Sequence, residues 1–237
     1  MLEKVDPITN EHVVEIRYRH NARVLDHRGD WAERISAEMG LPEWRIVENR
    51  IDVYKDDHSE HAFIGFRHGG FTIADTNAKT VFPSRAGKLL RFVFGLREFG
   101  DRVHVERLGV RSRFCTTFAG EFAKLVDLYT EKYVSLHPAA KEAIGQGVHL
   151  LDIGAPMNFR DSLGQFNSQC GPMPQAQLES VFRKDEGYPA VGLYYDIDYF
   201  LHPGRKMDAA EVVEAITNFA HAGWDRHDRV RSAILGD

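Results

Sequence analysis

Cysteine is scarce in this chain of 237 residues, which holds only Cys115 and Cys170. Two isolated thiols in different local contexts exclude a disulfide-based scaffold, because small secreted domains that depend on such bridges carry more cysteines. The two thiols fit a protein that works in a reducing cytoplasm.

Long apolar runs are absent as well. The segment 89–96 is among the longest apolar clusters, and Arg91 interrupts it. No segment approaches the roughly 18 to 20 apolar residues that a transmembrane helix needs. The first residues, M-L-E-K-V-D-P, lack the basic region and apolar core of a secretory signal. The sequence therefore predicts a cytoplasmic protein with no membrane partner.

The chain also lacks an excess of positive charge. It has 30 lysines and arginines against 35 aspartates and glutamates, which gives a formal net charge of -5. A net acidic molecule is not drawn as a whole to nucleic acid, so we expect no nucleic-acid partner. Hydrophobic residues make up 43% and charged residues 27%, as is usual for a globular protein with a sizeable core.

Segments with the period of a strand and segments with the period of a helix alternate along the chain. The pair Gly69-Gly70 is a two-residue hairpin signal, and Asp208 with Glu211 forms an acidic capping box. The segment 156–174 has no period and predicts a functional loop or an irregular connection. We expect strands at 12–19, 44–55, 62–68, 71–75, 102–116, 148–153 and 191–202, and helices at 29–39, 83–98, 121–136, 175–182 and from Asp208 onward.

Antiparallel hairpins combined with a few long helices predict an α+β fold, with an antiparallel or mixed sheet packed by four to five helices. We expect a single α+β domain over residues 1–237. Each half of the chain holds strands followed by a helix, which leaves a division into two subdomains, 1–118 and 119–237, open.

The segment 191–202, V-G-L-Y-Y-D-I-D-Y-F-L-H, poses the sharpest chemical question. Alternation along a strand places Asp196, Asp198 and His202 on one face, with the two aspartates roughly 6.5 to 7 Å apart at the backbone. Such a pair could bind a divalent metal for phosphoryl transfer, with His202 as a further ligand or a base. The structural alternative is pairing of the carboxylates with arginines.

The predicted strand at 102–116 offers those arginines. Arg107, Arg111 and Arg113 share one of its faces with Gly109. If the two strands are neighbours, bidentate arginine–carboxylate pairs satisfy both sets of charges. We favour this charge network over a metal site.

A basic helix face is a second candidate site. Arg85, Lys88 and Arg91 fall close to one face of the helix at 83–98, where a phosphate-bearing partner could dock. The plainer interpretation is a solvated helix face on a net acidic protein.

A third candidate lies in the segment D-D-H-S-E-H at 56–61, where Asp56, His58 and His61 are weak candidate metal ligands. We favour a solvated turn between strands, because turns are normally polar and no distant ligand set accompanies it. Phosphate-loop, nucleophile-elbow and zinc-protease motifs are absent from the sequence. We therefore expect no metal and no cofactor.

Three short motifs together resemble a sporadically distributed family of uncharacterised bacterial proteins. They are an N-terminal strand ending in E-I-R-[FY], a central strand of the type R-x-G-x-R, and a late strand of the type L-D-I-D. Ser112 departs from the pattern, since an aromatic residue often follows the central arginine there. The resemblance implies that the arginine strand and the D-I-D strand occur as companions, and it implies no activity, cofactor or partner. The matching positions are Glu15, Arg17, Arg107, Gly109, Arg111, Asp196 and Asp198.

These observations favour a non-enzymatic binding or interaction protein, an accessory partner in a bacterial multi-protein system. The support is the lack of a complete catalytic constellation, and we expect a protein partner while a homo-oligomer stays open. The alternative is a metal-dependent phosphoryl-transfer or hydrolytic enzyme that uses Asp196 and Asp198. A nucleic-acid binder that uses the basic helix is the weakest alternative.

Overall fold

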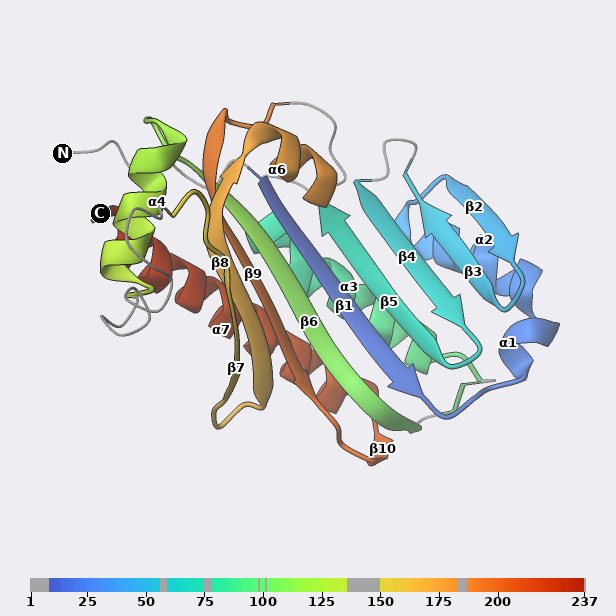
Figure 1. The fold of residues 1–237 in the computed structure, drawn as a ribbon. Coiled ribbons are helices and arrows are strands. Elements are labelled where there is room, and N and C mark those ends of the chain that lie inside the picture. Colours follow the sequence, from blue (N-terminus) through green and yellow to red (C-terminus); the bar gives the residue numbers. More distant parts are fainter. Residues whose placement is uncertain are drawn as a thin grey trace.

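The structure, a computed structural model, describes residues 9–55, 59–74, 78–97, 99–100, 102–135, 150–182 and 187–236. These residues form one sheet of ten strands with helices mainly on one of its faces (Figure 1). Every neighbouring pair of strands in this sheet is antiparallel. The predicted α+β class is confirmed, with an antiparallel sheet.

The sheet follows the order β2-β3-β4-β5-β1-β6-β9-β8-β7, and β10 pairs with β6 off this path. The central strands β1, β6 and β9 come from distant parts of the chain and bring its two halves into one sheet. The strands are β1 (Thr9–Tyr18), β2 (Glu43–Val47), β3 (Arg50–Tyr54), β4 (Glu60–Gly65), β5 (His68–Ala74), β6 (Val103–Thr117), β7 (Ala155–Arg160), β8 (Gln165–Pro174), β9 (Val191–Leu201) and β10 (Arg205–Met207).

Six helices lie within the described residues, slightly more than the four to five expected from the sequence. The extra helix is α1, a single turn that the apolar pattern was too short to indicate. The helices are α1 (Arg23–Asp26), α2 (Arg28–Met39), α3 (Ala78–Phe94), α4 (Phe122–Lys132), α6 (Gln175–Val181) and α7 (Ala209–Leu235).

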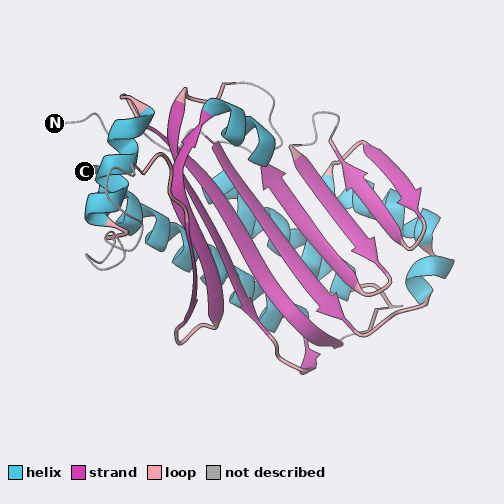
Figure 2. Cartoon of the chain, in the orientation of Figure 1, coloured by secondary structure: helices cyan, strands magenta, loops and turns pink. Residues whose placement is uncertain are grey.

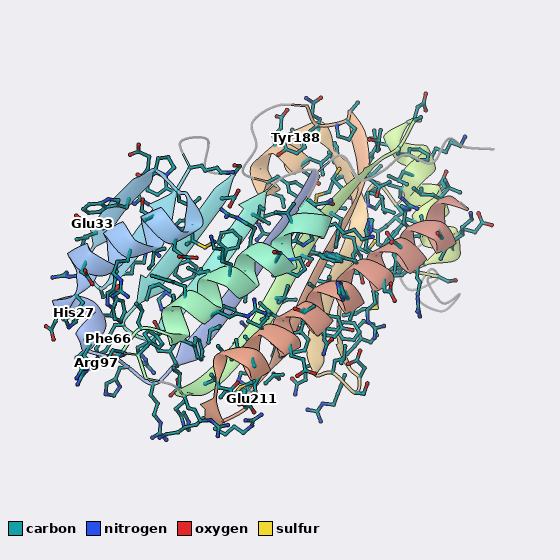
Figure 3. The ribbon with its side chains drawn as sticks, turned by 180° about the vertical axis from the view of Figure 1, so that it is seen from behind. His27, Glu33, Phe66, Arg97, Tyr188 and Glu211 are labelled. Atoms are coloured by element: carbon teal, nitrogen blue, oxygen red, sulfur yellow. The ribbon has the colours of Figure 1, made fainter. Side chains whose placement is uncertain are left out.

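The main core lies between the sheet and the helices α2, α3 and α7. In β1 the apolar Val14 and Ile16 are buried beneath these helices, whereas Glu15 and Arg17 alternate with them and project from the other face. Figure 3 shows α3 and α7 running side by side across the back of the sheet. The alternation of apolar and charged residues along β1 therefore determines which face of the sheet the helices cover.

Helix α7 begins as the sequence predicts. The Asp208 carboxylate accepts a hydrogen bond from the backbone N–H of Glu211, and the Glu211 carboxylate accepts one from the backbone N–H of Asp208. This reciprocal capping box satisfies N–H groups that a helix start leaves without partners.

Two predictions about the strands between α2 and α3 were wrong. The segment 44–55, expected as one strand, is the hairpin β2–β3, in which Val47 pairs with Arg50 across a two-residue turn. Arg28 donates to the carbonyl of Glu48 in this turn (2.8 Å), an interaction with a distant residue that the local pattern could not reveal.

The pair Gly69-Gly70 lies inside β5 and not in the turn that we expected. A Cβ atom on Gly70 would lie 2.2 Å from the carbonyl oxygen of Val14 and 2.8 Å from the Phe63 ring. Glycine is needed here for the close approach of neighbouring strands, and not for a turn conformation.

The segment 156–174 was also predicted wrongly, because most of it forms the regular hairpin β7–β8. Strand β8 pairs with β9, which buries Phe166, Ser168 and Cys170 on one face and leaves Asn167 and Gln169 exposed on the other. Since the buried residues include polar and small ones, the alternation did not stand out in the sequence. Conversely, residues 150–153 of the predicted strand 148–153 are not in a strand.

The helix predicted at 83–98 begins earlier, at Ala78, and contains Pro83. Phe82 and Ala86, on either side of this proline, are fully buried, and their packing outweighs the backbone hydrogen bond that proline removes. No helix within the described ranges is long and apolar enough to span a membrane.

Candidate functional site

The open face is the side of the sheet opposite α2, α3 and α7. Among the described residues, Figure 2 shows these strands without a covering helix over most of their length, and α6 lies across one end. There Leu178 of α6 packs against Cys115 and Tyr194 in a small second core. Beyond α6, the open face is where polar side chains of the central strands project.

Charged side chains of both signs form a network on this face. The register of β6 and β9 places Arg111 opposite Asp198 and Arg113 opposite Asp196. The pairing of β1 with β6 adds further carboxylates beside these arginines. The network consists of Glu11, Glu15, Arg17, Arg107, Arg111, Arg113, Asp196 and Asp198.

Asp196 is held by Arg111. The Nε of Arg111 donates to both carboxylate oxygens of Asp196 (2.9 and 3.1 Å), and the Tyr194 hydroxyl donates to one of them (3.1 Å). The hydrogen bonds to Asp196 raise the pKa of Arg111. The Asp196 side chain is only 8% exposed, whereas Arg111 is 45% exposed. The buried carboxylate thus fixes a guanidinium group that still faces solvent.

Asp198 belongs to a second chain of ion pairs. Arg107 donates to Asp198 (2.8 Å) and to Glu15 (3.0 Å), and Arg17 donates to the other oxygen of Glu15 (3.1 Å). The Arg107 guanidinium also lies over the ring of Phe200, 5.0 Å from its centroid. Burial raises the pKa of Asp198 although Arg107 opposes the shift.

Glu11 and Arg113 close the network at the end near α6. Arg113 donates to Glu11 (2.7 Å), whose side chain is almost completely buried. The network therefore runs across the three central strands, and each of the two aspartates that the sequence singled out contacts an arginine of β6.

Two neighbouring hollows open on this face. The amide hollow, of about 290 Å³, lies over β7, β8 and β9, and its polar lining includes Asn158, Asn167 and Gln169. The arginine hollow, of about 430 Å³, lies over β1 and β6, and four arginines of the network line it. Arg111 and Asp198 line both hollows and so form the ridge between them. Together they give a contact surface with charges of both signs.

His202, expected beside the two aspartates, lies just beyond the end of β9. Its ring nitrogen Nδ1 is 3.2 Å from the carbonyl oxygen of Glu106, and it lines neither hollow. The His202 ring centroid is 5.6 Å from that of Phe200, the ring that lies beneath the Arg107 guanidinium, so His202 lies at the end of the open face and outside the two hollows that the aspartates line.

The basic residues of α3 are not brought together as one free patch. Arg85 donates to Glu60 and to the carbonyl oxygen of Met39 (2.7 Å), and it is partly buried. Lys88 pairs with Glu38 (3.2 Å), whereas Arg91 is exposed. The phosphate-docking hypothesis for this face stays a prediction.

Of the weak metal candidates, Asp56 and His58 lie outside the described residues. His61 lies in β4, and its Nε2 is 3.0 Å from Asp52. Within the described ranges, no group of three or more histidine, cysteine, aspartate or glutamate side chains is arranged to hold a metal.

Sequence reasoning missed a second charge cluster, around Asp52 on the open side of β3. The Asp52 side chain is fully buried and accepts hydrogen bonds from Arg45 Nε (3.1 Å) and from an outer nitrogen of Arg50 (3.3 Å). The Nε2 of His61 is 3.0 Å from the other oxygen of Asp52. Burial opposes ionisation, but the hydrogen bonds from His61 and Arg45 lower the pKa of Asp52. Alternation in R-I-D-V-Y could have shown that Asp52 faces away from Ile51 and Val53.

A third polar group lies inside the main core, beneath β1 and β6. His12 contacts the hydroxyl of Ser112 (2.8 Å) and the rings of Phe82 and Trp224. Burial lowers the pKa of His12 to about 3. Nearby, His227 is stacked on Phe114, and burial lowers its pKa too. Both histidines are therefore neutral in the folded protein at neutral pH.

The fold and the open face define an α+β protein in which one side of an antiparallel sheet carries an ordered network of charges. No protein-family model matches the chain, and no curated protein is detectably similar to it. The geometry of the open face is therefore the feature that points to a function.

Proposed function

We propose that this chain is a non-enzymatic binding protein, an accessory partner in a bacterial multi-protein system, and that the open face binds another protein. The observation that carries the proposal is the charge network on β1, β6 and β9, which is held in place by its own ion pairs and is left uncovered by α2, α3 and α7. Charged groups that are already ordered lose little entropy when a partner binds.

The distribution of charge supports a protein partner. The arginine hollow combines four arginines with three carboxylates, and the amide hollow combines uncharged amides with two aspartates and Arg111. Such a surface complements a partner that carries both acidic and basic side chains. Charge complementarity of this kind sets orientation and association rate, and it disfavours wrong partners.

The enzyme alternative would require a metal to compete with arginines. Arg111 contacts Asp196 and Arg107 contacts Asp198. A divalent metal would have to displace both guanidinium groups, which would then face the cation. This cost favours the binding proposal over phosphoryl transfer through the two aspartates.

Site-specific photo-crosslinking tests the proposal. A benzoylphenylalanine at Gln169, an exposed residue that lines the amide hollow, is compared with one at Glu214, an exposed residue of α7 on the other side of the molecule. In cells of the source organism, we expect an adduct with a defined protein from position 169 and none from position 214.

The cross-linked protein is then identified, purified and titrated against the chain. We expect Arg17→Glu, a change at a side chain that is 56% exposed on the open face, to weaken binding, and Glu214→Lys to leave it unchanged. Equal crosslinking from both positions, or an affinity that ignores Arg17→Glu, would contradict the proposal. A calorimetric Mg²⁺ titration that is saturable in the natural chain and lost in Asp196→Asn would favour the enzyme.

A further inference from the structure

The two edges of the sheet differ in how well they are protected. Edge strands expose backbone groups that can pair with another chain, and natural proteins often block them with proline or lysine. The edge strand β7 contains Pro156, which has no N–H group to donate. The opposite edge strand β2 contains neither proline nor lysine. Strand β2 is therefore the edge that is open to pairing.

Strand β2 is also unusually apolar for an exposed element. All five of its residues are exposed, and Trp44, Ile46 and Val47 are 41%, 43% and 37% exposed. These three are a large share of the exposed large apolar side chains in the described part of the chain. An edge with this composition favours association with another strand.

The hairpin geometry sets which backbone groups of β2 are available. Val47 and Arg50 close the two-residue turn, so they exchange hydrogen bonds with each other. Hydrogen bonding alternates along an antiparallel pair, so the N–H and C=O groups of Trp44 and Ile46 point away from β3. Within the described residues no strand lies on that side of β2.

We infer that β2 pairs antiparallel with β2 of a second copy of this chain, with Trp44 opposite Trp44. In this register Glu43 of each copy lies opposite Arg45 of the other, and the two ion pairs are related by the two-fold axis. Glu43 forms no ion pair with a residue that the structure describes. Arg45 uses its Nε for Asp52 and keeps its outer nitrogens for a further carboxylate.

The neighbouring register is disfavoured by charge. Shifting the pairing so that Trp44 lies opposite Ile46 places Arg45 directly opposite Arg45, and like charges in this position destabilise a sheet. Backbone hydrogen bonding does not favour either register. When Trp44 lies opposite Trp44, Ile46 lies opposite Pro42 of the other copy, and the carbonyl oxygen of Pro42 can accept from the N–H of Ile46. The charge pattern E-W-R therefore selects the register with Trp44 opposite itself.

The pairing extends the sheet across two copies and leaves both open faces uncovered. Trp44 and Ile46 lie opposite Val53 and Ile51, whose side chains are buried on the covered face, so the apolar contact forms on that face, away from the charge network. Two five-residue strands bury less than the roughly 800 Å² per partner of a standard interface. Association is therefore expected to depend on concentration.

Sedimentation equilibrium of the full chain over a wide concentration range measures the association. We expect a mass that rises from one to two copies, and a dissociation constant about tenfold weaker in Glu43→Lys, which replaces both ion pairs by repulsion. Glu214→Lys, the same charge change on α7, is the matched control and should leave the constant unchanged.

Disulfide trapping then reads the register. The natural cysteines are both buried, so an introduced surface thiol reports on its own position. Under mild oxidation we expect Trp44→Cys to give a covalent dimer and Arg45→Cys to give little, because only residues opposite themselves meet within bonding distance. A single-copy mass at every concentration, or efficient trapping through position 45 in place of 44, would overturn the inference.

Discussion

Replacing Arg111 by alanine tests whether the charge network stabilises the fold. The change removes all three hydrogen bonds that Arg111 donates to Asp196, whose side chain is 8% exposed. Among the described residues, the Tyr194 hydroxyl (3.1 Å) is the side-chain donor that remains. A hydrogen bond to a charged group contributes about 1.5 to 3 kcal/mol, and the 45% exposure of Arg111 lowers that contribution. We therefore expect the free energy of unfolding to fall by about 2 to 3 kcal/mol.

The matched control is Arg17→Ala. Arg17 donates twice to one carboxylate, Glu15, but the two side chains are 56% and 27% exposed. Exposed ion pairs are worth less than about 1 kcal/mol, so this variant should stay close to the natural chain. The contrast between the two alanine variants isolates the effect of a buried carboxylate.

Urea unfolding of a double-mutant cycle provides the measurement. The cycle comprises Arg111→Ala, Asp196→Asn and the double variant, and we expect the double variant to lose less than the sum of the single ones by about 1 kcal/mol or more. For a chain of this size a loss of about 2 kcal/mol lowers Tm by roughly 4 to 8 °C. If Arg111→Ala lost no more than Arg17→Ala, or if the two changes were additive, the ion-pair interpretation of Asp196 would be refuted.

Three further predictions concern the core, the sheet and the last helix. Burial lowers the pKa of His12 from 6.5 to about 3 on folding. Below about pH 6.5 the unfolded chain therefore binds a proton that the folded protein does not, and the free energy of unfolding falls by about 1.4 kcal/mol for each pH unit. Urea unfolding between pH 7 and pH 4.5 should show this loss, and a His12→Gln variant with an equally steep slope would contradict it. Gly70→Ala should lower the free energy of unfolding by more than about 2 kcal/mol, because the new Cβ would lie 2.2 Å from the carbonyl oxygen of Val14. Gly29→Ala in α2 is the control, since its new Cβ has open space and the change should be neutral or stabilising. Equal Tm values for the two variants would show that the sheet adjusts to the added Cβ. Asp208→Ala should lose about 1 kcal/mol with the capping box of α7, and an unchanged midpoint in urea would show that the cap is dispensable.

The sequence predicted those elements in which a local pattern is strong. The aromatic and β-branched run around Asp196 is strand β9, which ends at Leu201, one residue before the predicted end. The capping box at Asp208 starts α7 as expected. In both cases neighbouring residues alone determine the structure, through side-chain alternation in the strand and through short-range hydrogen bonds at the helix start.

Structure that depends on contacts between distant residues was harder to predict. The hairpin within 44–55 is supported by Arg28, some twenty residues away, and Gly70 is required by the approach of Val14 from another strand. Likewise, the ion pairs of Asp196 and Asp198 run diagonally to Arg111 and Arg107, and not to the residues directly opposite in the register. The direction in which each side chain leans across the sheet decides such diagonal partners, and a sequence pattern does not contain it.

The open face shows a further limit of alternation as a signal. Alternation predicts that Asp196, Asp198, Glu15 and Arg17 face away from the core, and the structure agrees. It does not predict whether a second layer covers that side of the sheet. Had a helix covered it, the same ion pairs would be fully desolvated and their role would be structural alone. Because Arg111 is held by a buried carboxylate and still faces solvent, one residue can stabilise the fold and present an ordered charge to a partner. The variants that separate these roles are therefore changes at exposed members such as Arg17, and not at Arg111.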